Sequence, residues 1–320
     1  MKIAFIGAGA LGSYVGSVLA EAGVDLTLYD VRKDHVEMIR KEGLTISPAG
    51  GESKHYKAPI TDDLSGMGKM DAVIVATKSY HTKAAIEGAV SLVGDDTLVC
   101  SFQNGAGNLD VLNEVVGIPE RIVAMTTAHS FMMVSPTHLQ YFLGAGGVEL
   151  GPMQGEVSPK IQELAEIMKN LKVPVMVHDR GSDVVWNKIL WNAVLNCTAA
   201  VTGMDVPAMC ETPEIHPVFN AIGDEYFGVS EKMDVKVTHP RNFVELLIFA
   251  GRAAGKIKGV KPVKPSMLQD LEAGRLTEVE FINGAIVRQG EKHGVPTPVN
   301  KTMVHIVKTI EKKGQPDTSE

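Results

Sequence analysis

The chain has 320 residues, 44% of them hydrophobic and 22% charged, which is ordinary for a folded protein with room for two domains. Its formal net charge is -7, so it lacks the basic excess that nucleic-acid binding requires. Three cysteines lack metal-type spacing, no apolar run approaches a membrane span, and Met1 and Lys2 lead directly into an apolar segment. We therefore expect a cytoplasmic protein with no disulfide framework, metal site, nucleic-acid partner or membrane span.

The first motif is a glycine-rich turn between a predicted strand, 2–6, and an amphipathic helix that ends at Gly23. In such a turn Gly7 permits the tight bend, Gly9 lets the backbone approach a pyrophosphate, and Gly12 lets the helix pack on the strand. The N–H groups at the start of the helix favour phosphates. The pattern predicts a dinucleotide site, the alternative being a glycine-rich turn of another α/β fold. Its residues are Gly7, Ala8, Gly9, Ala10, Leu11 and Gly12.

A second predicted strand, 26–29, ends at Asp30. A carboxylate about 20 residues beyond the glycine-rich turn accepts hydrogen bonds from the ribose 2′-hydroxyl of NAD and repels the 2′-phosphate of NADP. Arg32 follows two residues later and could pair with that phosphate instead. The sequence therefore admits NADPH or NADH as the cofactor and favours NADH.

Further short apolar runs predict an α/β fold. Two buried strands, 71–76 and 99–102, deliver Lys78 and Asn104 beyond their carboxyl ends, where ligands bind in parallel sheets. For each residue the alternative is a solvated loop tip or a cap. A hairpin-like excursion is expected at 44–60, and more strands are expected at 121–125, 139–143, 147–150 and 173–177.

The α/β pattern stops near Asp179, and almost everything after Ser182 has helical periodicity. We therefore predict a Rossmann-type doubly wound sheet in residues 1–179 and an all-helical domain in residues 180–320. A disordered tail is expected at 314–320.

The helical half opens with a polar stripe. Lys188, Asn192 and Asn196 stand four residues apart, so a helix places one ammonium and two amides on the same face. Apolar residues surround them, and burying an unpaired polar group costs roughly 2–7 kcal/mol. The stripe therefore faces either water or a site.

Seven pieces of sequence, in order from residue 7 to residue 300, resemble the ketopantoate reductase family of the 6-phosphogluconate-dehydrogenase-like oxidoreductases. Each piece is weak alone, and the ordered set is specific. They are the glycine-rich turn, Lys78, Gln103-Asn104-Gly105, Trp186-Asn187-Lys188 with Asn192 and Asn196, Ser266 to Asp270, Thr277 to Gly284, and Gly294 to Asn300.

The resemblance implies that a 2-keto acid, 2-dehydropantoate (ketopantoate), is reduced to (R)-pantoate in pantothenate biosynthesis, with Lys188 as general acid. Hydride delivery builds negative charge on the ketone oxygen, which suits a protonated amine. The resemblance assigns substrate to Asn192, Asn196 and Ser266.

Other roles rest on the same resemblance. It gives Lys78 and Asn104 to the cofactor side, with Asn104 also near the substrate, and makes Glu278 a catalytic partner that orients Lys188 or contacts substrate or cofactor. The residues themselves leave an alternative, because Ser266 to Gln269 and Thr277 to Glu280 both fit helix capping boxes.

Two departures from the family pattern concern the substrate. Val206 stands where the family commonly has an asparagine, and Pro265 replaces the first of two serines. These changes, with Asp30, leave open an NAD-dependent D-2-hydroxyacid dehydrogenase acting on another branched or aromatic 2-keto acid. A non-catalytic NAD(H)-binding sensor is a third hypothesis. Apolar helices such as 243–250 predict a homodimer.

Overall fold

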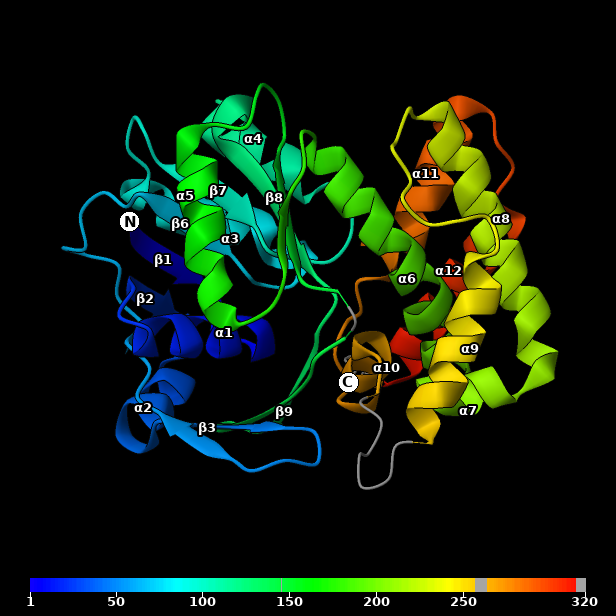
Figure 1. Ribbon diagram of the computed structural model, residues 1–320, viewed down its shortest axis with the longest axis horizontal. Helices are drawn as coiled ribbons and strands as arrows, with labels where there is room; N and C mark the ends of the chain where they lie inside the picture. Colours follow the sequence, from blue (N-terminus) through cyan, green and yellow to red (C-terminus); the bar gives the residue numbers. More distant parts are fainter. Residues whose placement is uncertain (145, 257–263, 315–320) are drawn as a thin grey trace, which may run out of the picture. The chain divides into compact units, whose positions relative to one another are not determined.

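The computed structural model describes residues 1–144, 146–256 and 264–314 (Figure 1). Contacts within the chain divide it into two compact units. The first contains residues 1–103 and 107–185, and the second contains residues 104–106 and 186–320. The sequence places the boundary at Asp179, whereas this division falls at Val185, inside a helix. The tail expected at 314–320 lies, apart from Gly314, outside the described residues.

The first unit is built on an eight-stranded sheet in the order β12-β11-β8-β7-β6-β1-β2-β5. Neighbouring strands are parallel except β8 and β11, which are antiparallel. The Rossmann-type prediction is confirmed. The strands are β1 (Lys2–Ile6), β2 (Asp25–Tyr29), β5 (Ile60–Thr61), β6 (Ala72–Val75), β7 (Leu98–Ser101), β8 (Ile122–Thr127), β11 (Val148–Pro152) and β12 (Val175–Val177).

Side chains that alternate along each strand give the sheet two apolar faces. In β1, Ile3 and Phe5 belong to one buried cluster, and Ala4 and Ile6 belong to the other. Helices cover both faces, as expected for a doubly wound sheet. The first cluster includes α1 (Ala10–Glu21), α2 (Lys33–Glu42) and α5 (Pro159–Met168), and the second includes α3 (Thr82–Ala89) and α4 (Asn108–Val116).

A second, four-stranded sheet in the first unit is absent from the sequence-based prediction. Its order is β4-β3-β10-β9, and Tyr14 of α1 packs against it through the rings of Phe131 and Tyr141, at centroid distances of 4.9 and 4.8 Å. The hairpin expected at 44–60 is confirmed as β3 with β4. The strands are β3 (Leu44–Pro48), β4 (Lys54–Tyr56), β9 (Ser130–Ser135) and β10 (His138–Phe142).

The regular secondary structure among the described residues of the second unit is helical, which confirms the all-helical prediction (Figure 1). Helix α6 is its core, because Ala193, Val194 and Cys197 are fully buried and the Tyr226 hydroxyl donates a 2.8 Å hydrogen bond to the Trp186 carbonyl. The helices are α6 (Gly181–Thr202), α7 (Val206–Glu211), α8 (His216–Lys232), α9 (Phe243–Gly255), α10 (Ser266–Glu272), α11 (Asn283–His293) and α12 (Pro298–Gly314).

Short 3-10 turns join several of these elements. Within the described ranges, none of the helices combines the length and apolarity needed to cross a membrane. The turns are η1 (Ser79–His81), η2 (Val90–Leu92), η3 (Pro119–Arg121), η4 (Lys169–Leu171), η5 (Pro213–Ile215) and η6 (Val279–Phe281).

Candidate functional site

The three glycines of the first turn have different surroundings. Gly7 follows β1 with a φ of +113°, which side chains rarely tolerate. A Cβ added at Gly12 would lie 2.1 Å from the Gly7 carbonyl oxygen, so the first turn of α1 packs directly on the bend. A Cβ added at Gly9 would meet nothing within 4 Å. The packing of the fold therefore does not require a glycine at position 9. The missing side chain leaves the backbone there accessible.

Asp30 is bound to the same turn. Its carboxylate accepts the Ala8 N–H at 3.0 Å and the Arg32 N–H at 3.0 Å, and it forms a two-pronged pair with the Arg32 guanidinium at 2.9 Å for each contact. Burial would raise the pKa of Asp30, but the hydrogen bonds and charge of Arg32, with the Ala8 N–H, outweigh it and lower that pKa. Asp30 is thus an anion at neutral pH. Its side chain is 8% exposed and that of Arg32 is 55% exposed, so Arg32 is the more accessible charge.

The carbonyl of Ala8 is held as firmly as its N–H. It accepts a hydrogen bond from the Ser13 hydroxyl at 3.0 Å and lies 3.1 Å from Nε2 of the buried His35. Because a carbonyl only accepts, His35 must carry its proton on Nε2 to make this contact. Nothing in the sequence around His35 indicates this role, because His35 lies in another helix, 27 residues away from Ala8.

Lys78 and Asn104 follow the carboxyl ends of the neighbouring parallel strands β6 and β7, as predicted, and Gln103 directly precedes Asn104. Lys78 is the residue before η1. The buried Gln103 amide donates to the Thr77 carbonyl at 3.0 Å and to the Thr82 hydroxyl at 2.9 Å. Gln103 therefore braces the backbone that carries Lys78, a function that the sequence motif alone did not reveal.

Residues 104–106 leave β7 and belong to the helical unit. Asn104 Oδ1 accepts a 3.1 Å hydrogen bond from Asn192 Nδ2, and the Ala106 N–H donates to the Phe281 carbonyl at 2.8 Å. Gly105 has a φ of +85°, and a Cβ there would lie 2.6 Å from Phe281 Cβ. This short loop thus joins Asn104 to the polar stripe of α6.

The stripe itself runs along α6. Asn192 and Asn196 are only 7% and 6% exposed, and Lys188 is half-buried. The alternative of a fully solvated face is therefore wrong for the two asparagines. Their amides can present donors without adding charge, beside a lysine one turn earlier on the helix.

Glu278 lies in a tightly held segment before η6 and is only 5% exposed. The Thr277 N–H and hydroxyl donate to one Glu311 oxygen at 2.7 and 2.5 Å. Glu280 pairs instead with Arg288 and Lys308. The capping-box alternative at Thr277 is therefore wrong, because the carboxylate that meets Thr277 comes from α12.

Ser266 is the first residue of α10 and half-buried. Pro265 occupies the cap position, and no side chain caps this helix. The second capping-box alternative is wrong as well, because Pro265 has no N–H for a reciprocal bond and the Gln269 amide donates to the Lys264 carbonyl at 2.7 Å.

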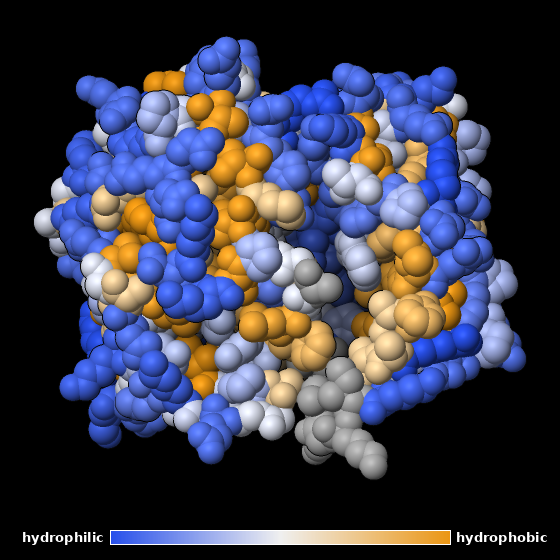
Figure 2. Space-filling model, in the orientation of Figure 1, coloured by the Kyte–Doolittle hydropathy of each residue, from blue (hydrophilic) through white to orange (hydrophobic). Residues whose placement is uncertain are grey.

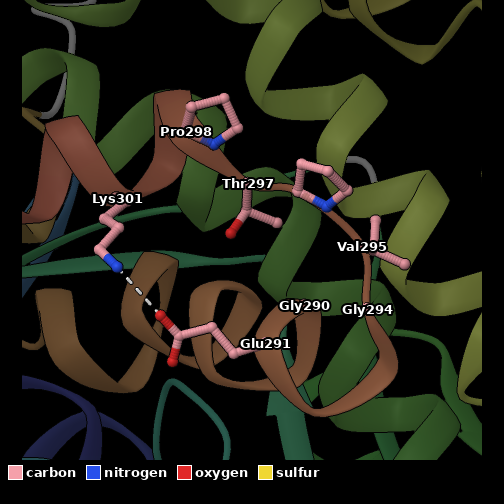
Figure 3. Close-up of a pocket in the computed structure, with 8 residues that line it drawn as sticks. Gly290, Glu291, Gly294, Val295, Thr297, Pro298 and Lys301 are labelled. Atoms are coloured by element: carbon pink, nitrogen blue, oxygen red, sulfur yellow. Dashed lines mark hydrogen bonds and ion pairs between the residues drawn. The ribbon is translucent and has the colours of Figure 1, made fainter.

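A shallow pocket of about 380 Å³ lies elsewhere, at the turn between α11 and α12 (Figure 3). An ion pair of 3.0 Å between Glu291 and Lys301 spans it, so their charges neutralise each other. No predicted site residue lines this pocket. Within residues 1–144, 146–256 and 264–314, no group of three or more potential ligands is placed to hold a metal ion.

Comparison with known proteins decides the family. The family model described as ketopantoate reductase PanE/ApbA matches residues 3–155, and the model of its C-terminal part matches residues 182–311. The chain belongs to the ketopantoate reductase family. The resemblance noted from the sequence motifs is confirmed, and the chain is an NAD(P)-dependent oxidoreductase of the 2-dehydropantoate 2-reductase type.

Two curated relatives span the whole chain. The 2-dehydropantoate 2-reductase of Archaeoglobus fulgidus is 29% identical over 97% of this chain and 98% of its own length. That of Halobacterium salinarum is 29% identical over 98% of this chain and 100% of its own length. The chain therefore matches both relatives along nearly its whole length.

Two solved structures have a similar fold over nearly the whole chain. D-mandelate dehydrogenase with NADH and anilino(oxo)acetate has a TM-score of 0.86 and 26% identity, covering 98% of this chain and 99% of its own. The PanE/ApbA family ketopantoate reductase from Ralstonia eutropha has a TM-score of 0.82 and 29% identity, covering 99% and 100%. Proteins with this fold are thus named for different compounds, the hydroxy acid mandelate in one and the keto acid ketopantoate in the other.

The glycine-rich turn of this family member gives a matched pair of variants. Gly9→Ala should change the free energy of unfolding by about 0.5 kcal/mol or less, because its Cβ meets nothing. It should raise the KM for the nicotinamide cofactor about tenfold, because the Cβ intrudes on the bare backbone. Gly12→Ala should cost about 3 kcal/mol or more. Urea unfolding and cofactor titration measure both effects. Equal stability loss in the two variants would contradict this assignment.

The loop at 104–106 provides a second pair. Gly105→Ala and Gly107→Ala both place a side chain at positive φ, which costs roughly 1–2 kcal/mol. Only the Gly105 variant also brings a Cβ within 3 Å of Phe281, so it should lose a further 1–3 kcal/mol or so. Chemical unfolding of the two variants side by side tests this, and an equal loss would show that the loop does not dock on η6.

Proposed function

We propose that this chain reduces 2-dehydropantoate to (R)-pantoate, taking hydride from NAD(P)H and a proton from Lys188. The observation that supports this proposal is the stripe of α6, where two buried asparagines accompany a half-buried lysine. The names of the curated relatives, which match nearly the whole chain, support ketopantoate as the substrate.

The reaction needs groups that this chain supplies. Hydride adds to the keto carbon, the electrons of the carbonyl double bond move to oxygen, and the Lys188 ammonium gives its proton to that oxygen. Lys188 is then a neutral amine and regains a proton from solvent. The cofactor supplies the hydride when it is bound. Asn192 and Asn196 would hold the substrate oxygens, and Asn104, which accepts from the Asn192 amide, fixes which end of that amide is presented.

Glu278 and Ser266 would complete the site. Glu278 is a buried carboxylate on a segment held by Glu311, so it can orient the Lys188 ammonium or accept a hydroxyl of the substrate. Ser266 contributes one hydroxyl from the start of α10.

A second candidate is the NAD-dependent D-2-hydroxyacid dehydrogenase. Val206, in place of the commoner asparagine, is the first residue of α7 and offers no side-chain hydrogen bond to a substrate hydroxyl. Among the similar structures is a D-mandelate dehydrogenase, in complex with NADH and anilino(oxo)acetate. A larger apolar side chain on the keto acid would suit this change.

A panel of 2-keto acids that includes ketopantoate, assayed with both reduced cofactors, tests the reaction. We expect turnover of ketopantoate, with Lys188→Ala lowering kcat by about 10²–10⁴ because the general acid is lost. Lys232→Ala, which removes an exposed lysine from α8, is the matched control and should retain wild-type kcat. Preference for another keto acid would favour the second candidate. Cofactor binding with no turnover of any keto acid would favour the non-catalytic NAD(H) sensor.

The cofactor preference is a separate proposal, namely that Asp30 favours NADH over NADPH. Its buried negative charge lies at the end of β2, and the exposed Arg32 offsets only part of it. Asp30→Asn keeps an acceptor for the Ala8 N–H and removes the charge. It should lower the ratio of kcat/KM with NADH to that with NADPH about tenfold, whereas Arg32→Ala should raise that ratio. A wild-type protein that prefers NADPH would contradict the proposal.

The homodimer and the cytoplasmic location stay predictions. Helix α9 exposes large apolar side chains, with Leu246 at 50% and Phe249 at 76%, and Figure 2 shows apolar surface over this helix. We propose that α9 packs against a second copy of the chain, because exposed apolar patches commonly mark interfaces.

A further inference from the structure

A line of buried amides crosses the helical unit beneath the polar stripe. Asn283, the first residue of α11, is 0% exposed and donates from Nδ2 to the Ala193 carbonyl at 3.2 Å and to Asn300 Oδ1 at 2.9 Å. Asn300, also 0% exposed, donates in turn to the Glu225 carboxylate at 2.7 Å. Four helices, α6, α8, α11 and α12, are thus linked through side-chain amides.

The far end of this line is anchored by charge. The Glu225 carboxylate also accepts the backbone N–H groups of Val299 and Asn300, at 2.7 and 2.9 Å, in the first turn of α12. An acidic group at a helix N-terminus is favourable because it meets unpaired N–H groups and the positive end of the helix dipole. Glu225 therefore fixes the orientation of the Asn300 amide, and Asn300 then presents its oxygen to Asn283.

The contribution of Asn283 lies in the hydrogen bonds that its side-chain nitrogen donates. Both hydrogens of Nδ2 are used, whereas its Oδ1 is buried without a hydrogen-bond partner among the residues that the structure describes. Leaving a buried acceptor unsatisfied is unfavourable, and an apolar side chain of the same shape would avoid that cost. The two bonds from Nδ2 are therefore what an asparagine provides at this position and an apolar residue would not.

The bond from Asn283 to Ala193 links two stretches of chain that carry residues assigned to the reaction. Ala193 is the sequence neighbour of Asn192 on α6, and Asn283 ends the segment that carries Glu278. The same segment is held at its start by Glu311 through Thr277. It is thus held at both ends, and the Asn283 end is hydrogen-bonded directly to α6.

We propose that Asn283 is a positioning residue, whose amide sets the register of the Glu278 segment against the Asn192 and Asn196 face of α6. This inference rests on the proposed keto acid reduction and adds a residue that touches neither substrate nor cofactor. Misplacing reacting groups by about 1 Å can cost roughly 100-fold in rate, so a small shift of this segment is sufficient.

Asn283→Asp is the sharpest test, because it keeps the shape and turns the paired donor into an acceptor that faces two acceptors. We expect kcat for the best keto acid to fall about 100-fold, with the dissociation constant for the reduced cofactor unchanged. The matched control is Val244→Ala, which removes buried volume from α9 in the same unit. It should lower the melting temperature and leave kcat unchanged.

The pH profile separates positioning from mere destabilisation. A protonated carboxyl at position 283 can again donate one hydrogen bond, so the ratio of variant to wild-type kcat should rise as the pH falls. The corresponding ratio for Val244→Ala should stay flat. If Asn283→Asp does not fold, Glu225→Gln is used instead, and we expect a smaller fall in kcat, about tenfold, with cofactor binding retained.

The outcomes are distinguishable. A wild-type protein that reduces a keto acid, with Asn283→Asp losing stability but no more activity than Val244→Ala, overturns the positioning role and leaves the proposed function standing. A wild-type protein that binds cofactor but reduces no keto acid overturns both.

Discussion

Hydrogen bonds between amides buried inside the helical unit organise the helical part of the candidate site. Helix α6 carries asparagines into positions that are more than nine-tenths buried. One is met by Asn104 from the loop after β7, and the backbone of α6 is met by Asn283 from the start of α11. Because an unpaired buried amide is costly, these partners hold the loop and the helix in defined places.

In the first unit, a buried carboxylate, that of Asp30, organises the glycine-rich turn. Asp30 lies where a carboxylate would contact a ribose, yet it also holds the Ala8 N–H and the Arg32 side chain. A single residue thus shapes the glycine-rich turn and sets the charge beside it. Its lowered pKa keeps it ionised, so both contributions persist at neutral pH.

Sequence patterns predicted best those elements whose burial is local and periodic. The strands β1, β2, β6 and β7 are short apolar runs, and the glycine-rich turn lies between strand and helix as the pattern requires. Strand β9 escaped prediction because, among its residues Ser130–Ser135, three are exposed and three are only partly buried, and because it pairs with β10. The capping box at Thr277 failed because Glu311, 34 residues away, supplies the carboxylate. The one at Ser266 failed because its neighbour Pro265 occupies the cap position and has no N–H.

By itself, the sequence determined the two-part architecture and the glycine-rich turn, because both are recognised from periodicity and spacing among residues a few positions apart. It also determined the order of the family motifs, which is read along the chain. The tertiary structure alone decided that Gln103 braces the Lys78 segment, that residues 104–106 join the helical unit, and that Asn283, Asn300 and Glu225 form one line. The hydrogen bonds of Gln103, Asn283 and Asn300 join residues separated by 17 to 90 positions, and only the packing of whole elements brings such residues within hydrogen-bond distance.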